Sequence, residues 1–113
     1  MDATEKIKPE EGLAVLGKWR EDYAPLRVYF SAAGFGADFN CSISDISGTL
    51  LTLNLEGLSI APWFELKGCL FGYGAPPAAV SAFSTSTGRR YDSALLVRSF
   101  AGAWSLAFME LAG

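Results

Sequence analysis

The chain has 113 residues, half of them hydrophobic, which suits a single domain (1–113) with a hydrophobic core. Its net charge of −3 argues against binding to nucleic-acid polymers, because nonspecific binding of that kind depends on Lys and Arg neutralising phosphates. No stretch approaches the roughly 18 apolar residues of a membrane-spanning helix, and the charged N-terminus lacks the apolar segment of a signal peptide. We therefore expect a cytoplasmic protein without a membrane contact.

The charged residues are unevenly distributed. Ten of the 21 lie in residues 1–22, and the remaining 91 residues hold eleven. A domain so poor in charge can hide part of its surface in a homo-oligomer or against a partner protein. A surface rich in Ser, Thr and Gly explains the same composition without any partner, and both interpretations stay open.

The chain contains two cysteines, Cys41 and Cys69. Without an export signal, two buried free thiols in a reducing compartment are favoured over a disulfide.

Residues 1–8 are expected to be frayed, and a helix is predicted over residues 9–22. Pro9 suits the first turn of a helix, and the two glutamates after it favour the positive end of the helix dipole. Four side chains at helical spacing predict one buried stripe: Val15, Leu16, Trp19 and Tyr23. Because Gly12 and Gly17 weaken the helix, it should depend on packing across a β-core.

Residues 26–111 are predicted to form that β-core. Period-2 alternation and turn residues indicate a strand over 26–32, a hairpin over 39–55 with its turn at 44–48, and strands over 63–73, 93–100 and 104–111. Short connections favour antiparallel pairing of these six strands. The predicted class is α+β, mainly β: one N-terminal helix packed on a six-stranded antiparallel sheet or small barrel.

Two features break the alternation. Continuing it from Phe39 would turn the carboxylate of Asp45 inward, which is costly, so the strand should end or bulge there with Asp45 capping the turn. Gly68 and Gly72 interrupt the strand over 63–73 and predict a bend, as at the corner of a small barrel.

The chemistry of common active sites is missing. The chain has no histidine, which removes the most frequent general base and most transition-metal sites. It has no P-loop, dinucleotide fingerprint, nucleophile elbow or zinc motif. We expect no metal, no cofactor and no catalysis. An enzyme would need a pocket with paired carboxylates, for which the candidates are Asp38, Glu65, Asp92 and Glu110.

The longest irregular stretch runs from 74 to 90, and a short extra strand near Val80–Phe83 is compatible with its sequence. Loops beyond about 12 residues are often functional. Ser84–Arg90 combines hydroxyl groups, a glycine and the adjacent Arg89 and Arg90. Such a loop can bind phosphate or carboxylate, because guanidinium groups match these anions. Two solvated arginines are the alternative interpretation.

Asp45-Ile46-Ser47-Gly48, placed between two strands of a small β-protein, resembles the D/N-x-S-x-x-G signature of PilZ domains. The resemblance implies a small β-barrel, and many such barrels bind cyclic dinucleotides. This sequence departs from the pattern, because Gly48 comes one residue early and no Arg-x-x-x-Arg precedes residue 26. It therefore resembles a divergent member that has lost the nucleotide site, with only Asp45 and Ser47 as candidate ligand-binding positions.

These observations favour a non-catalytic soluble β-module that acts through protein–protein contact or self-association. The alternative is a sensor or binding domain for a small anionic ligand such as a cyclic nucleotide, with Arg89, Arg90, Asp45 and Ser47 as its residues. An enzyme of unknown class is the third hypothesis.

Overall fold

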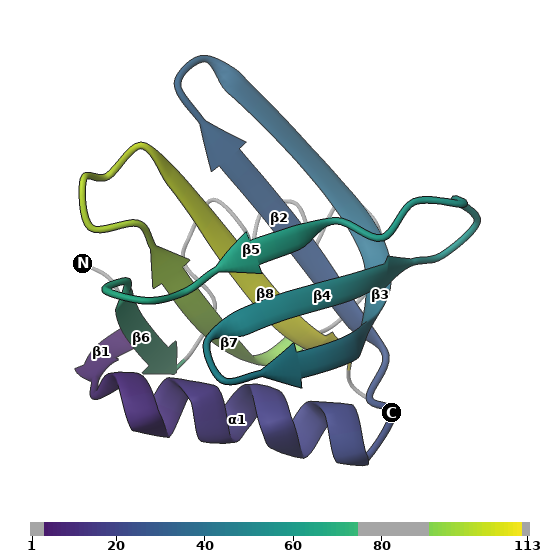
Figure 1. Cartoon of the computed structure of the whole chain (residues 1–113), viewed down its shortest axis with the longest axis horizontal. Helices are drawn as coiled ribbons and strands as arrows, with labels where there is room; N and C mark the ends of the chain where they lie inside the picture. The colour runs from purple at the N-terminus through teal and green to yellow at the C-terminus, as the bar shows by residue number, and fades with distance from the viewer. Residues whose placement is uncertain (1–3, 75–90, 112–113) are drawn as a thin grey trace.

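One helix and eight strands make up the part of the chain that the computed structural model describes, residues 4–74 and 91–111 (Figure 1). The elements are β1 (Thr4–Ile7), α1 (Pro9–Glu21), β2 (Leu26–Ala32), β3 (Phe35–Ser47), β4 (Leu50–Leu55), β5 (Trp63–Glu65), β6 (Leu70–Gly74), β7 (Tyr91–Arg98) and β8 (Trp104–Leu111). All pair antiparallel in a single sheet with the order β1-β6-β7-β8-β2-β3-β4-β5. The mainly β class with an N-terminal helix is therefore confirmed.

The sheet is curled but open, so the small barrel is wrong. Within the described residues the two ends of the strand order, β1 and β5, pair with β6 and β4 respectively, and not with each other. The curl nevertheless brings β5 over the concave face, where it crosses β2 and β8 in Figure 1. The ring of Phe64 on β5 lies 6.0 Å from that of Phe30 on β2 and 5.7 Å from that of Trp104 on β8. Ring packing, and not a closed ladder of hydrogen bonds, joins this end of the sheet to its middle.

The single strand predicted over 63–73 is two strands, β5 and β6. This division and the additional strand β1 raise the number of described strands from the predicted six to eight. Leu66–Cys69 forms a turn, with the Cys69 N–H donating to the Leu66 carbonyl at 3.0 Å and Gly68 at a φ of +78°. Only glycine adopts this conformation readily, so Gly68 ends the strand where a bend was expected. As a result β5 lies at one end of the strand order, and β6 is the second strand from the other end.

The expectation that residues 1–8 are frayed is wrong for Thr4–Ile7. These residues form β1 and pair with β6 from Thr4–Gly74 to Ile7–Phe71. The backbone hydrogen bonds of this ladder hold the strand, although its sequence carries no apolar alternation that sequence analysis can detect. The extra strand considered near Val80–Phe83 lies outside the described residues.

Helix α1 covers the open side of the curl and completes the core (Figure 1). It contacts β3 and β6, which β7, β8 and β2 separate in the strand order. Leu16 and Trp19 are 0% and 4% exposed, so the predicted packing of the helix on the β-core is confirmed. Among the described residues there is no helix with the length and apolarity needed to cross a lipid bilayer.

Tyr23 does not belong to the buried stripe and is 85% exposed. The helix ends at Glu21, and the Tyr23 and Ala24 N–H groups donate to the carbonyls of Arg20 and Trp19. These two bonds form a Schellman motif, which requires a left-handed residue after the cap. Tyr23 takes that conformation with a φ of +49°, and this turns its side chain away from the core.

The predicted irregularity in the central hairpin is a bulge, since the register between β3 and β4 shifts between Ile43 and Asp45. The strand continues to Ser47, and the turn is shortened to Gly48 and Thr49. Asp45 does not cap this turn: its carboxylate lies 3.5 Å from the guanidinium of Arg20 on α1. The bulge therefore turns the carboxylate outward, where it forms an exposed ion pair.

Both cysteines are free and buried, as predicted. Burial raises the pKa of the Cys41 thiol to about 12 and also raises the pKa of Cys69. The two side chains belong to the hydrophobic core, so they act as small apolar groups.

Candidate functional site

Of the four residues predicted to bind an anionic ligand, the structure describes two, Asp45 and Ser47. Arg89 and Arg90 lie outside the described residues, and their role stays a prediction. Asp45 and Ser47 are exposed on β3, and Asp45 is paired with Arg20. The ion pair places the positive charge of Arg20 beside Asp45, and the role of Asp45 and Ser47 in ligand binding stays a prediction.

The carboxylates considered for catalysis have separate partners. Glu65 accepts hydrogen bonds from the Thr49 hydroxyl and the Lys67 N–H, and these bonds lower its pKa. Glu110 accepts a hydrogen bond of 2.6 Å from the Trp19 indole, and Asp38 forms an ion pair with Arg27. The side chain of Asp92 lies outside the description. In residues 4–74 and 91–111 no three His, Cys, Asp or Glu side chains gather as a metal site.

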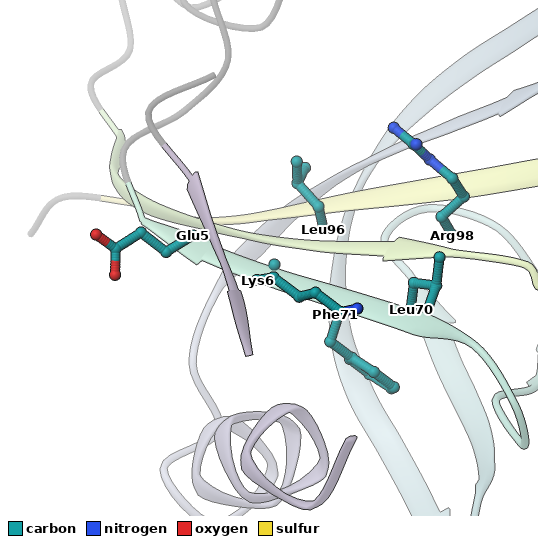
Figure 2. Close-up of a pocket in the computed structure, with 7 residues that line it drawn as sticks. Glu5, Lys6, Leu70, Phe71, Leu96 and Arg98 are labelled. Atoms are coloured by element: carbon teal, nitrogen blue, oxygen red, sulfur yellow. The ribbon is translucent and has the colours of Figure 1, made fainter. Parts of the chain in front are cut away.

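An open hollow of about 230 Å³ lies on the outer face of the sheet, over β1, β6 and β7 (Figure 2). It forms because Gly72 has no side chain and stands between Lys6 on β1 and Leu96 on β7 in the register. In Figure 2 the Lys6 side chain runs over β6, Arg98 stands at the far end of the hollow, and the Glu5 carboxylate points away. Neither cation forms an ion pair with a described residue. The hollow thus presents two positive charges beside an apolar surface.

A second cavity, of about 210 Å³, opens on the inner face and is apolar throughout. We call it the inner pocket. One wall is the first part of β3, with Phe35, Ala37 and Phe39, and the opposite wall is Ile60 and Pro62 from the connection between β4 and β5. Side chains of β2, β4, β5 and β8 complete it. Because no polar group lines it, this pocket suits an apolar side chain or hydrocarbon, and not a charged ligand.

The rim of the inner pocket is exposed and apolar. Phe35 and Ile60, on opposite walls, are 60% and 57% exposed. The Phe35 ring lies 6.1 Å from that of Phe30 at an interplanar angle of 61°, an edge-to-face arrangement that holds it at the rim. A contiguous apolar surface of this kind, open to water on a folded protein, is typical of a binding site.

Sequence analysis missed both cavities. Residues 33–38 lay outside the predicted strand over 26–32 and the predicted hairpin over 39–55, whereas β3 already begins at Phe35. The alternation of Phe35, Ala37 and Phe39 was a readable signal for one wall of the inner pocket. The outer hollow had no local signal, because Lys6 and Arg98 meet only through pairing of β1, β6 and β7.

Comparison with protein-family models, with curated proteins and with solved structures finds no match to this chain. The resemblance to PilZ domains therefore stays a prediction that depends on four residues, the last three of β3 and Gly48 in the turn after it.

Proposed function

We propose that this chain is a non-catalytic β-module that acts by binding a protein chain, either a partner or another copy of itself. The observation that carries the proposal is the inner pocket with its exposed rim of Phe35 and Ile60. Covering a large apolar side chain contributes about 1.5–3 kcal/mol, so contact with a protein surface at these residues is favourable.

The apolar walls also argue for binding over catalysis. Enzymes stabilise charge that develops in the transition state, which requires oriented polar groups at the reacting atoms. The inner pocket has none, and the described carboxylates lie with their own partners away from it. The two free thiols support a reducing compartment such as the cytoplasm as the place of action.

Site-specific photo-crosslinking tests the proposal in the native cell. A benzoylphenylalanine at position 35 should crosslink to a protein identified by mass spectrometry, whereas the same residue at position 100, which is 84% exposed on a turn away from the pocket, should not. A product of twice the chain mass would identify self-association, and light scattering at high micromolar concentration would then show an oligomer. Equal products from positions 35 and 100 would contradict the proposal.

A small anionic ligand is the second candidate, and it is favoured by Lys6 and Arg98 in the outer hollow, which form no ion pair with a described residue. If it is right, a cyclic dinucleotide or inorganic phosphate should raise the melting temperature, because a ligand that binds the native state stabilises it. The variant Lys6→Ala/Arg98→Ala should lose the shift, and Lys67→Ala, an exposed lysine outside the hollow, should keep it. No shift in melting temperature at millimolar ligand would contradict this second candidate function.

A further inference from the structure

The first part of β3 has a free backbone edge beside the inner pocket. Residues 35–41 pair with β2 on one side, but β4 covers the other side only from Cys41 onward. The Asn40 carbonyl still accepts a hydrogen bond of 2.9 Å from the Glu56 N–H on that side. Because backbone groups alternate along a strand, those of Asp38 and Gly36 point toward the same edge. No described residue pairs with them there.

The edge is free because the chain turns away from it at Gly57. The φ of Gly57 is +80°, and the Leu58 N–H donates to the Leu55 carbonyl, so the segment that follows β4 leaves the line of the strand. It returns on the far side of β4, where the Pro62 carbonyl accepts from Leu53. The inner pocket is the space that this excursion leaves beside β3.

The free edge also lacks the usual protection against strand addition. Natural edge strands are kept from pairing with other chains by Lys, Pro, inward charges or short length. The segment 35–39 contains no Lys or Pro, and its single charge, Asp38, is bound to Arg27. By contrast, the edge strand β1 carries Lys6 and Glu5, and β5 has only three residues.

The side chains beside this edge match an extended partner. Phe35, Ala37 and Phe39 face the inner pocket, whereas Gly36 and Asp38 turn their backbone groups to the edge. A strand added antiparallel would place a residue directly opposite Ala37, in a pair that lacks hydrogen bonds and brings side chains close together. Because Ala37 is the smallest residue of this wall, there is room for a large apolar side chain opposite it.

We propose that the edge at Gly36 and Asp38, together with the inner pocket, binds an extended segment of a partner protein as an additional antiparallel strand. The segment hydrogen-bonds to the backbone of these two residues and inserts a large apolar side chain opposite Ala37. This inference rests on the proposed function and states the chemistry of the partner.

A second copy of the chain fits this edge less well. The symmetric pairing in which Gly36 of one β3 edge bonds to Asp38 of the other centres on Ala37, so two alanines face each other and both pockets stay empty. A small apolar molecule would fill the pocket but leave the backbone edge unused. A foreign peptide satisfies both features.

Peptide selection by phage display, followed by hydrogen exchange, tests the proposal. A phage-displayed library of linear nine-residue peptides is selected on the full chain, and the most enriched peptide is synthesised as the probe. In the free protein the amides of Gly36 and Asp38 should exchange quickly, whereas those of Ala37 and Phe39, paired with β2, should exchange slowly. The probe should slow exchange at Gly36 and Asp38.

Two leucine substitutions supply matched variants. Ala37→Leu fills the pocket from its wall and should weaken binding of the probe about tenfold or more. Ala33→Leu, on the exposed turn between β2 and β3, should leave affinity unchanged. Circular dichroism checks that both variants fold. If Ala37→Leu does not fold, the hydrogen-exchange measurement on the unmodified chain still tests the proposal.

Three results would overturn the proposal: no peptide enriched over the bare support, equal affinity for both leucine variants, or exchange at Gly36 and Asp38 that the probe does not change. Protection of these amides that rises with protein concentration alone would also overturn it, in favour of a second copy. If crosslinking from position 35 succeeds while the peptide test fails, the binding function stands and only the mode is wrong.

Discussion

Replacing Gly12 by alanine should destabilise the protein even though alanine is the better helix former. A Cβ built on Gly12 would lie 2.2 Å, 2.7 Å and 2.8 Å from Cδ2, Cγ and Cε2 of Phe71. Phe71 is buried, and its strand is held by β1 on one side and β7 on the other, so the ring cannot retreat. The alanine gains about 1 kcal/mol of helix propensity, and overpacking of this severity costs about 3 kcal/mol. We expect a net loss of about 2 kcal/mol.

Gly17 provides the matched control in the same helix. Apart from the chain neighbours and the backbone of the helix itself, no described atom lies within 4 Å of a Cβ at this position, so Gly17→Ala should raise the free energy of unfolding by up to about 1 kcal/mol. Urea denaturation followed by far-UV circular dichroism measures both variants. In a Phe71→Leu background the penalty of Gly12→Ala should shrink, because the smaller side chain leaves room. If Gly12→Ala proved as stabilising as Gly17→Ala, the close packing of α1 on β6 would be refuted.

Three further predictions concern the helix and the core. Trp19→Ala should cost roughly 3–5 kcal/mol in urea denaturation, since the indole is buried; a loss below about 1 kcal/mol would mean that the helix does not pack on the sheet through this residue. Tyr23→Gly should stabilise by about 1 kcal/mol in the same assay, because glycine adopts the left-handed conformation without strain, and no gain would argue against the Schellman motif. The raised pKa of Cys41 means that the unfolded chain loses this proton before the folded one does. Stability should therefore be constant at neutral pH and fall as pH rises from the ordinary value of 9.0 toward about 12. Cys41→Ala should show a shallower alkaline decline, and identical pH profiles would contradict the burial of the thiol.

Local signals were sufficient for several elements. The predicted helix over 9–22 differs from α1 by one residue, and the strands over 26–32 and 104–111 have the bounds of β2 and β8. In each case a clear hydrophobic periodicity ends at residues that stop a helix or strand, so the local sequence determines the bounds of the element. The bulge near Asp45 was also predictable, because burial of its carboxylate is costly.

Features that depend on distant partners were not predictable. The alternation over 63–73 cannot reveal that β5 pairs with β4 while β6 pairs with β1 and β7. Tyr23 has the spacing of a buried residue, but the cap geometry decides its direction. The inner pocket depends on where Gly57 diverts the chain relative to β3, which no local pattern encodes. The predicted site residues carry charged or hydroxyl side chains, whereas this pocket is apolar.

The strand order also determines when the molecule can be assembled during synthesis. β8 is the last strand that the structure describes along the chain, yet it lies in the middle of the sheet, between β7 and β2. Until residue 111 has left the ribosome, the strands β1, β6 and β7 and the strands β2–β5 are separate half-sheets, each with an unpaired edge where β8 belongs. Such contacts between distant residues slow folding and leave edges open to wrong partners. A nascent chain that stops before Trp104 should therefore contain two half-sheets that no strand joins. We expect a chaperone to stay bound to it until β8 pairs with β7 and β2.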